Sequence, residues 1–478
     1  MKLESLSLAM IAAVLATSCA NEELVDVNPD VQGNALHFSP MVGHSRAIQT
    51  TVDNLGDFAV VAKGIHPHGG VYANYLIGGA NGGAVATRQD DTKNIWNLAD
   101  NVYWPSAMDA AVFWAYTASR INKSTNTKTK VLPAGVTFGF DANGTTPTIS
   151  GFSPVRAELS KDVTDDYWND GDEQVDLLVS FKQQNRTESA SNVDLTFEHA
   201  LSQITVKAKS ADKTANDHRI VKIKGAWIVN TKDKANLSAG FNWEEANRKA
   251  TADTKWDSGV INENGFSAYG SFYKQPKVLE KASDEEPLLG SSLMLIPQKL
   301  EAWKVNETDN GAYILLLCRV ELKHEGTDHT GSDTDIDDVK IHGNNHYHQQ
   351  FPVNKDKKFV EEEYGFACVP VASTWQMGKK YEYILDICGA TTGAGIYPPD
   401  FTSEVIGKLI PTDKSFISID GKTPLKLKTV LRSESYDDTD KNKKVVGDPV
   451  LDAPIQFSVK VTLWDENTGW TNGSIGMQ

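Results

Sequence analysis

The stretch from Val193 to Lys209, VDLTFEHALSQITVKAK, constrains the fold more strongly than any other part of the chain. Apolar residues occupy every second position, which is the period of a β-strand. The apolar positions change phase near Ser202 and Gln203, so one continuous strand would turn its apolar side chains from one face of a sheet to the other. We therefore predict two strands here, joined by a bulge or by a bend between sheets.

Short alternating runs of the same kind recur between polar loops, whereas long helical periodicity is scarce. The cleanest period of two lies near the C-terminus, where the apolar positions are Ile455, Phe457, Val459, Val461 and Leu463. Further strands are predicted at residues 220–229, 293–296, 313–323, 366–371 and 381–388. This pattern indicates an all-β protein of the sandwich type.

Two segments of the first half are apolar in both phases, Asp57 to Ala62 and Ala110 to Tyr116. A strand of this kind is packed from both sides, as the central strands of a sheet are. We predict that Ala110 to Tyr116, which is rich in aromatic residues, lies at the centre of the first core. The alternative is an exposed aromatic platform for stacking sugars, but the unbroken apolar flanks favour the core.

With 478 residues the chain is long for one domain, and two or three are expected. A polar run from Lys209 to Asp217 suggests the boundary, which divides the chain into an N-terminal β-sandwich at residues 36–210 and a C-terminal one at residues 211–478. The net charge of −16 argues against nucleic acid as a partner, because phosphate binding depends on clustered Lys and Arg.

The first 19 residues have the features of a lipoprotein signal peptide. One early cation, Lys2, precedes an apolar run that is too short to span a bilayer, and small residues stand directly before Cys19. We expect Cys19 to be the lipidated residue and residues 20–35, which are acidic and flexible, to be a tether. The alternative is an ordinary secretory signal with a chance cysteine.

The remaining reactive residues do not form a recognisable site. If Cys19 is lipidated, three cysteines are left, an odd number that cannot all pair, although one bridge among Cys318, Cys368 and Cys388 is open. Cys318 is in phase with apolar neighbours and is expected in the core. The residues from Glu325 to Lys358 are expected to form a long polar loop.

The sequence contains two clusters of possible metal ligands. The histidines His342, His346 and His348 near Asp333 to Asp338, and the acidic residues around Gly171, are interpreted as solvated segments, without a metal, a cofactor or catalytic residues.

Several motifs together resemble the fimbrillin (Mfa-like) family of Bacteroidales. They are LATSC at residues 15–19, LHFSPMVGHSRA at 36–47, NVYWPSAMDAAVFWAY at 101–116, the run at 193–209, LMLIPQ at 293–298 and FSVKVTLW at 457–464. The resemblance implies two transthyretin-like β-sandwich domains in tandem, export as an outer-membrane lipoprotein on the cell surface, and assembly into type V pili with other pilin subunits.

In that family a protease cuts after an arginine, the first strand leaves, and a strand from a neighbouring subunit fills the groove. The resemblance places this cut between Arg46 and Ala47 and assigns Leu36 to Phe38 to the removed strand. Residues 455–463 are the candidate donor or closing strand. Two features depart from the pattern: the tail after Trp464 is polar, and the chain is longer than a simple shaft subunit needs.

The resulting hypothesis is a lipid-anchored fimbrial subunit, structural or adhesive, without enzymatic activity and with host or bacterial surface ligands as further partners. Two alternatives from other classes are a monomeric surface lipoprotein that binds glycans and a surface glycosidase. Solvent-exposed aromatic pairs on a concave face would favour the glycan-binding protein, and paired carboxylates in a cleft would favour the enzyme.

Overall fold

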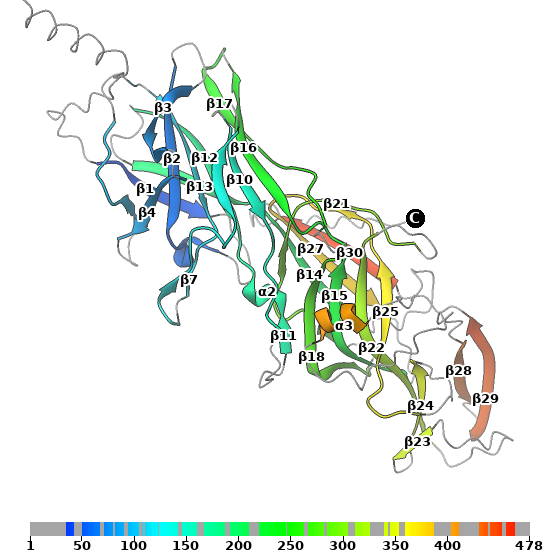
Figure 1. The fold of residues 1–478 in the computed structure, drawn as a ribbon. Helices are drawn as coiled ribbons and strands as arrows, with labels where there is room; N and C mark the ends of the chain where they lie inside the picture. The colour runs from blue at the N-terminus through cyan, green and yellow to red at the C-terminus, as the bar shows by residue number, and fades with distance from the viewer. Residues whose placement is uncertain are drawn as a thin grey trace, which may run out of the picture.

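A computed structural model of the chain describes the following residues: 35–42, 50–66, 71–79, 82–89, 94–104, 108, 110–122, 124–141, 146–159, 167–186, 192–209, 219–244, 246–261, 266–281, 284–304, 311–325, 339–342, 345–352, 359–386, 403–410, 430–437, 440–451 and 456–463. Strands dominate these residues, and the prediction of an all-β fold is confirmed (Figure 1). The division into two tandem sandwiches stays a prediction. Neither described α-helix has the length and apolar character needed to cross a lipid bilayer.

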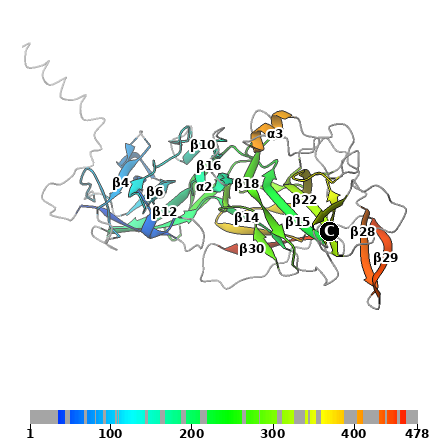
Figure 2. The same ribbon diagram turned by 90° about the horizontal axis from the view of Figure 1, so that it is seen from below.

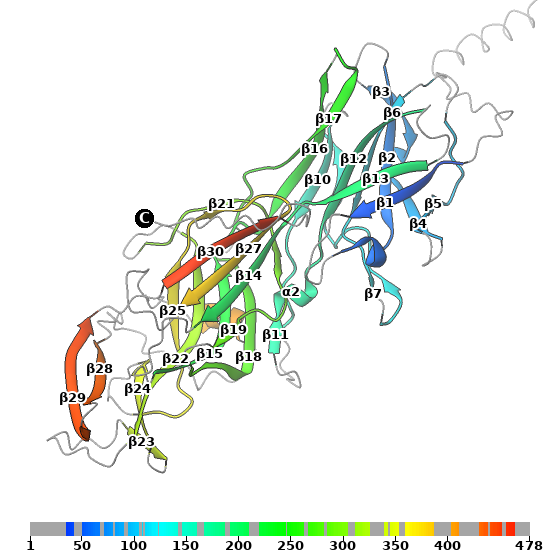
Figure 3. The same ribbon diagram turned by 180° about the vertical axis from the view of Figure 1, so that it is seen from behind.

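The strands fall into two groups, which lie at opposite ends of an elongated molecule (Figures 1 and 3). The first group contains an eight-stranded sheet in the order β3-β2-β4-β5-β1-β13-β12-β6. Its strands are β1 His37–Val42, β2 Phe58–Ile65, β3 Val71–Ile77, β4 Ala84–Arg88, β5 Trp96–Leu98, β6 Ala110–Thr117, β12 Leu178–Asn185 and β13 Asn192–His199. Because β2 also pairs with β6, seven of these strands close into a ring, in which β1 stands between β5 and β13.

The inside of this ring is a core to which almost every strand contributes. Phe38, Phe58, Trp96, Phe113 and Phe197 are its large rings, and all are buried. The predictions for Asp57 to Ala62 and for Ala110 to Tyr116 are confirmed, since every residue of β2 is buried and β6 is buried except at Ala110. Both strands need apolar residues in both phases because a second sheet covers the outside of the ring.

This second sheet has the order β17-β16-β10-β9 and consists of β9 Thr137–Phe140, β10 Pro147–Phe152, β16 Ala235–Glu244 and β17 Lys249–Trp256. Its aromatic side chains pack on the outward residues of β6 and β12. The ring of Trp114 in β6 lies 5.9 Å from that of Phe241 in β16 and 6.0 Å from that of Phe181 in the neighbouring strand β12. The outer sheet therefore covers the side of the ring that β6 and β12 form, which lies away from β1.

The second group also contains two sheets. The larger has the order β11-β18-β15-β22-β24-β23, with β25 on β22, and consists of β11 Tyr167–Asn169, β15 Arg219–Val229, β18 Ala268–Leu279, β22 Tyr313–Glu325, β23 Val339–His342, β24 Asn345–Phe351 and β25 Gly365–Pro370. The smaller consists of β14 Ser202–Lys209, β19 Glu285–Pro287, β20 Leu293–Leu295, β27 Lys379–Asp386 and β30 Gln456–Leu463. The largest apolar cluster among the described residues unites side chains from both sheets.

The other face of the larger sheet is covered by the helix α3 Ser403–Leu409 (Figure 2). Its residues Ile406 and Leu409 are buried in a cluster with Trp227 and Phe272. The remaining described elements are the 3-10 helix η1 Val52–Asn54, the one-turn helix α2 Asp170–Glu173, and three two-stranded pairs: β7 Ile121–Asn122 with β8 Thr127–Lys128, β21 Lys299–Leu300 with β26 Ser373–Thr374, and β28 Val430–Asp437 with β29 Asp440–Leu451.

The predicted change of phase within residues 193–209 is a bend between sheets. β13 ends at His199 in the ring, and β14 begins at Ser202 in the smaller sheet of the second group. The other predicted strands correspond to β15, β20, β22, β25, β27 and β30, with bounds that differ by a few residues. The period of two was sufficient to find these strands because each buries one face or both.

The long loop predicted from Glu325 to Lys358 is wrong in part, because this stretch contains the hairpin β23–β24. β22 continues to Glu325, and its last residues pair with β24, for instance His324 with His346. The pairing satisfies backbone groups whatever the side chains are, so a polar sequence can still form strands.

The chain passes between the two groups more than once. β14 and β15 belong to the second group, β16 and β17 return to the outer sheet of the first, and β18 lies in the second again. The boundary near residue 210 stays a prediction. The strand pairing shows in addition that β16, from the C-terminal side of this boundary, pairs with β10 from the N-terminal side, and that β17 joins the same sheet through β16.

The acidic residues around Gly171 are not the solvated turn predicted from the sequence. Asp170 is buried between the groups, where its carboxylate accepts backbone hydrogen bonds of 2.8 Å from Ala157 and from Gly270. Burial raises the pKa of Asp170, although Arg156 and these two N–H groups oppose the effect. Asp172 accepts a hydrogen bond from Ser291, so the one-turn helix is a polar junction between the groups.

Candidate functional site: the seat of the first strand

The side chains of the first strand alternate between the core of the ring and the outside. Leu36, just before β1, is 3% exposed and Phe38 is 0% exposed, and Pro40 is also buried. Met41, in the other phase, is 56% exposed. The segment therefore has the alternation of a strand with one buried face, and the strand that was expected at Leu36–Phe38 continues to Val42.

Phe38 is the central contact of this segment with the core. Its ring lies 6.0 Å from Phe58 and 6.4 Å from Phe113, edge to face in both pairs. Full burial of a Leu or Phe side chain contributes about 1.5–3 kcal/mol each. Leu36 and Phe38 together therefore stabilise the docking of β1 by several kcal/mol. We call the gap between β5 and β13 that β1 fills the seat of β1. Without β1, this seat would expose the aromatic interior of the ring.

The backbone of β1 joins β5 and β13, which do not pair with each other. It runs parallel to β13 over six residue pairs, from His37 with Asn192 to Val42 with Phe197. It runs antiparallel to β5 over only two pairs, and the backbone N–H of Leu36 donates to the carbonyl of Val102 at 2.8 Å. Removal of β1 would open the ring between β5 and β13 and leave their backbone groups without partners, which are the conditions for addition of a new strand.

The second half of β1 is held from one side only, because the pairing with β5 ends at Phe38. Pro40 lies in this half. Because β1 has a neighbouring strand on one side only here, the N–H group that proline lacks is not needed for a second ladder of hydrogen bonds. Ser39 donates a hydrogen bond of 2.8 Å to the Asn192 side chain across the parallel pair. The end of β1 that leads toward Arg46 is thus its less firmly bound end.

The predicted lipidation and processing residues, Cys19, Arg46 and Ala47, lie outside the described residues. The chain is described again from Thr50, whose buried backbone N–H lies 3.4 Å from Asp176 Oδ2. The same carboxylate oxygen lies 2.6 Å from His199 Nδ1, and both side chains are almost completely buried. The segment after the predicted cut is therefore attached to the ring independently of β1.

The candidate donor or closing strand is β30. It pairs antiparallel with β27 along its whole length, from Leu463 with Lys379 to Gln456 with Asp386, and it is the last strand of its sheet. Phe457, Val459 and Val461 lie within this ladder, whereas Ile455 lies outside the described residues. In the structure β30 belongs to the smaller sheet of the second group and does not pair with β5 or β13, the strands on either side of β1 (Figure 3).

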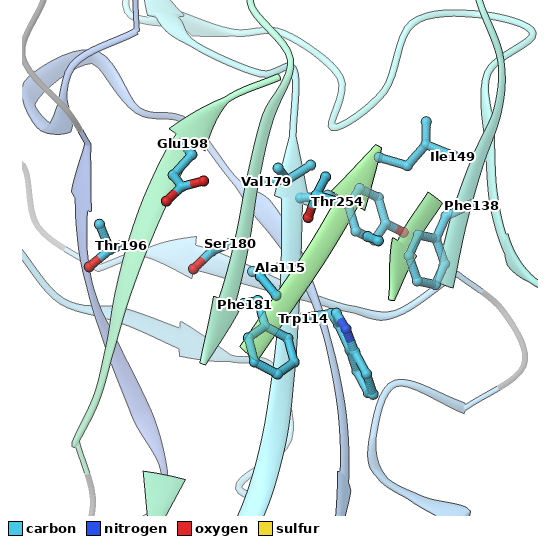
Figure 4. Close-up of a pocket in the computed structure, with 13 residues that line it drawn as sticks. Trp114, Ala115, Phe138, Ile149, Val179, Ser180, Phe181, Thr196, Glu198 and Thr254 are labelled. Carbon is cyan, nitrogen blue, oxygen red and sulfur yellow. The ribbon is translucent and has the colours of Figure 1, made fainter. Parts of the chain in front are cut away.

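A cavity of about 90 Å³ lies between the ring and the outer sheet, and its lining includes Trp114, Phe138, Phe181 and Thr254 (Figure 4). It has room for a few water molecules. Trp114 is only 2% exposed, and its faces are occupied by other rings. This aromatic cluster is part of the core and not a platform for stacking sugars.

The other chemically reactive residues do not form a centre in the part of the chain that the structure describes. No group of three metal-ligating side chains occurs there; His342 is exposed while His346 is buried. Cys318 and Cys368 are free and buried, as predicted for Cys318, and burial raises the pKa of Cys318 to about 12. Cys388 and residues 333–338 lie outside the description.

Sequence reasoning did not find β5 or the buried Asp176–His199 pair, and it found β13 as a strand without showing that β1 pairs with it. No local signal names the strand on which another strand will pair, because the contacts form between residues that are far apart in the chain. The alternation at Leu36–Phe38 was sufficient to find the start of the strand that fills the seat, but not the strands that form the seat.

Comparison with known proteins gives one strong match and several distant ones. The model of the fimbrillin-like family matches residues 45–395. A fimbrial protein from Bacteroides vulgatus has 12% identity and a TM-score of 0.39, and the match covers 73% of this chain and 94% of that one. A candidate cell adhesion protein from Parabacteroides distasonis has 10% identity and a TM-score of 0.33, with coverage of 90% and 100%. The search of curated proteins gave no match.

Proposed function

The chain belongs to the fimbrillin-like family, and we therefore propose that it is a fimbrial subunit of the cell surface, anchored in the outer membrane through a lipid on Cys19 and assembled with other pilin subunits by donor-strand exchange. Its role in this proposal is structural or adhesive, not enzymatic. We also propose that the two groups of strands are the two transthyretin-like sandwiches, preceded by the signal peptide at residues 1–19 and the tether at residues 20–35.

The observation that carries the assembly proposal is the place of β1 in the ring. It is the first described strand of the chain, it fills a seat between β5 and β13, and the segment with Arg46 follows it directly. A cut after Arg46 would leave β1 attached by noncovalent contacts alone. Because Thr50 is held by Asp176, the rest of the chain keeps its place when β1 leaves.

A second segment of the chain has the sequence pattern needed to replace β1. Residues 36–42 read LHFSPMV and residues 455–461 read IQFSVKV. Three positions are identical, and all four positions that alternate in phase with Phe38 are apolar in both segments. Since β1 runs parallel to β13, we propose that residues 455–461 of a second copy occupy the seat in the same direction, with Phe457 in the place of Phe38.

The first experiment treats purified precursor with an Arg-specific protease, identifies the new N-terminus by mass spectrometry and measures oligomers by light scattering. Cleavage after Arg46 followed by detergent-resistant oligomers is the expected result. An Arg46→Gln variant is the control, which should stay intact at this position and monomeric. Cleaved protein that remains strictly monomeric at high concentration would contradict donor-strand exchange and favour a monomeric surface lipoprotein.

The second experiment identifies the donor. A synthetic peptide with residues 455–463 is added during cleavage, and it should raise the melting temperature of the cleaved chain and suppress its oligomers. The control peptide has Phe457 and Ser458 exchanged, which preserves composition but turns the ring to the outward face. Equal effects of both peptides would show that the seat does not select this segment.

A further inference from the structure

The outward face of β13, which forms one wall of the seat of β1, is acidic. After Asn192, the outward residues of this strand are Asp194, Thr196 and Glu198, and all three are exposed. Asp194 accepts a hydrogen bond of 2.6 Å from the Asn192 side chain. Among the described residues, no basic side chain forms an ion pair with Asp194 or Glu198. This wall therefore presents two carboxylates that no described cation neutralises.

The described side chains that face Glu198 from neighbouring strands carry no positive charge. Val179 of β12 is its partner in the strand register. Ala252 and Thr254 of the outer sheet line the same cavity as Glu198, and no basic side chain lines this cavity (Figure 4). Lys255 stands in the opposite phase of β17 and is paired with an aspartate of its own strand. A cation for this face would therefore have to come from the strand that occupies the seat.

The strand β1 does not supply this cation. In its parallel register with β13, Ser39 lies opposite Asp194 and Met41 lies opposite Thr196. The Met41 side chain, which is 56% exposed, thus stands between the two carboxylates. From the usual spacing of strands and rise per residue, the Cα of Met41 lies about 8 Å diagonally from those of Asp194 and Glu198. An uncharged thioether gains no ion pair at this position.

The segment proposed as the donor differs from β1 at this point. In the proposed register, Ser458 replaces Ser39 and retains the hydroxyl group that Ser39 donates to the asparagine of β13. Lys460 replaces Met41. Lysine carries its charge on a flexible four-carbon stem, which can span the diagonal to a carboxylate on the neighbouring strand. The outward face of the seat is therefore a better match for the donor than for the strand that fills it in the precursor.

We propose that Asp194 and Glu198 are the residues by which the seat selects the incoming strand over β1, through ion pairs with Lys460 of a second copy. This inference rests on the proposed strand exchange and adds the residues that favour its forward direction. Opposite charges on neighbouring strands contribute modestly when they are exposed, and two such pairs correspond to about a threefold to tenfold difference in affinity. The buried Phe457 contributes most of the binding, and the lysine contributes the preference.

The first test is a competition between two peptides for the seat. The full chain is cleaved after Arg46 in an equimolar mixture of the peptide with residues 455–463 and its Lys460→Met form. Bound peptides are released with denaturant and quantified by mass spectrometry. At low salt the lysine peptide should be bound in about threefold to tenfold excess. At 1 M salt, where the Debye length is about 3 Å, the ratio should approach one.

The decisive acceptor variant combines Asp194→Asn with Glu198→Gln, which removes both charges and retains groups that accept hydrogen bonds. This variant should bind the two peptides equally. Because the ratio is measured within one sample, a smaller amount of folded acceptor does not change it. Asp253→Asn, at an exposed ion pair of the outer sheet, is the control and should leave the preference unchanged. A Lys460→Arg peptide should also retain the preference over the Lys460→Met peptide.

A second test places the lysine in β1 itself and requires neither cleavage nor a donor. In the uncleaved precursor, Met41→Lys should slow hydrogen exchange of residues 36–42 by about threefold to tenfold at low salt, because the lysine holds β1 in its seat. The same substitution should have no effect on exchange in the precursor that also contains Asp194→Asn and Glu198→Gln. The two measurements together form a cycle that isolates the contribution of the ion pairs.

The results separate this inference from the function on which it rests. If neither peptide binds, residues 455–463 are not the donor, and the donor assignment and this inference both fail. If the two peptides bind equally at low salt, or if the preference persists in the double variant, strand exchange stands and the role of the two carboxylates is refuted. Hydrogen exchange as fast in the Met41→Lys precursor as in the wild type would refute that role as well.

Discussion

Replacement of Phe38 by alanine tests the seat of β1 most directly. The Phe38 side chain is completely buried, and its ring meets two other rings edge to face. Phe→Ala substitutions in protein cores reduce the free energy of unfolding by about 3–5 kcal/mol, of which each aromatic pair contributes about 0.5–1.5 kcal/mol. The precursor with Phe38→Ala should therefore be destabilised by about 3–5 kcal/mol.

The size of this effect has an upper limit that is itself informative. Since β1 pairs with β5 over only two residues, it can undock while the rest of the ring stays folded. The measured loss then cannot exceed the free energy with which β1 docks. For a folding unit of this size, 3–5 kcal/mol corresponds to a decrease in Tm of about 10 °C, and a smaller decrease with faster hydrogen exchange in β1 would indicate undocking.

The assay is thermal and urea denaturation of the uncleaved precursor, with hydrogen exchange of residues 36–42 as the local measurement. Met41→Ala is the matched control, because Met41 belongs to the same strand but is 56% exposed, and it should change stability by less than about 0.5 kcal/mol. After cleavage and release of residues 1–46, the Phe38→Ala and wild-type proteins have the same sequence and should melt identically.

Two results would refute the reasoning. If Phe38→Ala destabilises the precursor no more than Met41→Ala does, β1 is not seated in the core of the ring. If the two proteins still melt differently after complete cleavage at Arg46, β1 remains bound without its covalent connection, and the seat is not available to a donor strand.

Three further predictions follow from other parts of the molecule. Cys19→Ser should release the uncleaved precursor from membranes, because the acyl chains provide the membrane affinity; unchanged membrane fractionation would disprove the anchor. Asp176→Ala should cost about 3–5 kcal/mol in urea denaturation, because it leaves its buried histidine partner and Thr50 without their acceptor, whereas Lys255→Ala at an exposed ion pair should cost less than about 1 kcal/mol. Cys318 and Cys368 should not react with thiol reagents at pH 8 in the native protein, since burial raises their pKa values and the thiolate is the reactive form; peptide mass spectrometry that finds either one labelled without denaturant would contradict their burial.

The sequence by itself determined the fold class, several of the longer strands and the location of the first core. These features depend on the local period of apolar residues, which shows where strands run and how many of their faces are buried. The two apolar phases of residues 110–116 indicated a strand covered from both sides, and the phase change near Ser202 indicated a bend. The sequence also pointed to Leu36–Phe38 as part of a first strand, which the structure extends to Val42.

Only the tertiary structure decided which strands meet. It placed β1 between β5 and β13, closed the ring through β2 and β6, returned β16 and β17 to the first group, and paired the polar hairpin β23–β24 with the end of β22. It also brought Lys222 and Arg319 together over a shared carboxylate. The physical reason is that periodicity records how deeply each side chain is buried, whereas pairing depends on contacts between residues that lie far apart in the chain and leave no local pattern.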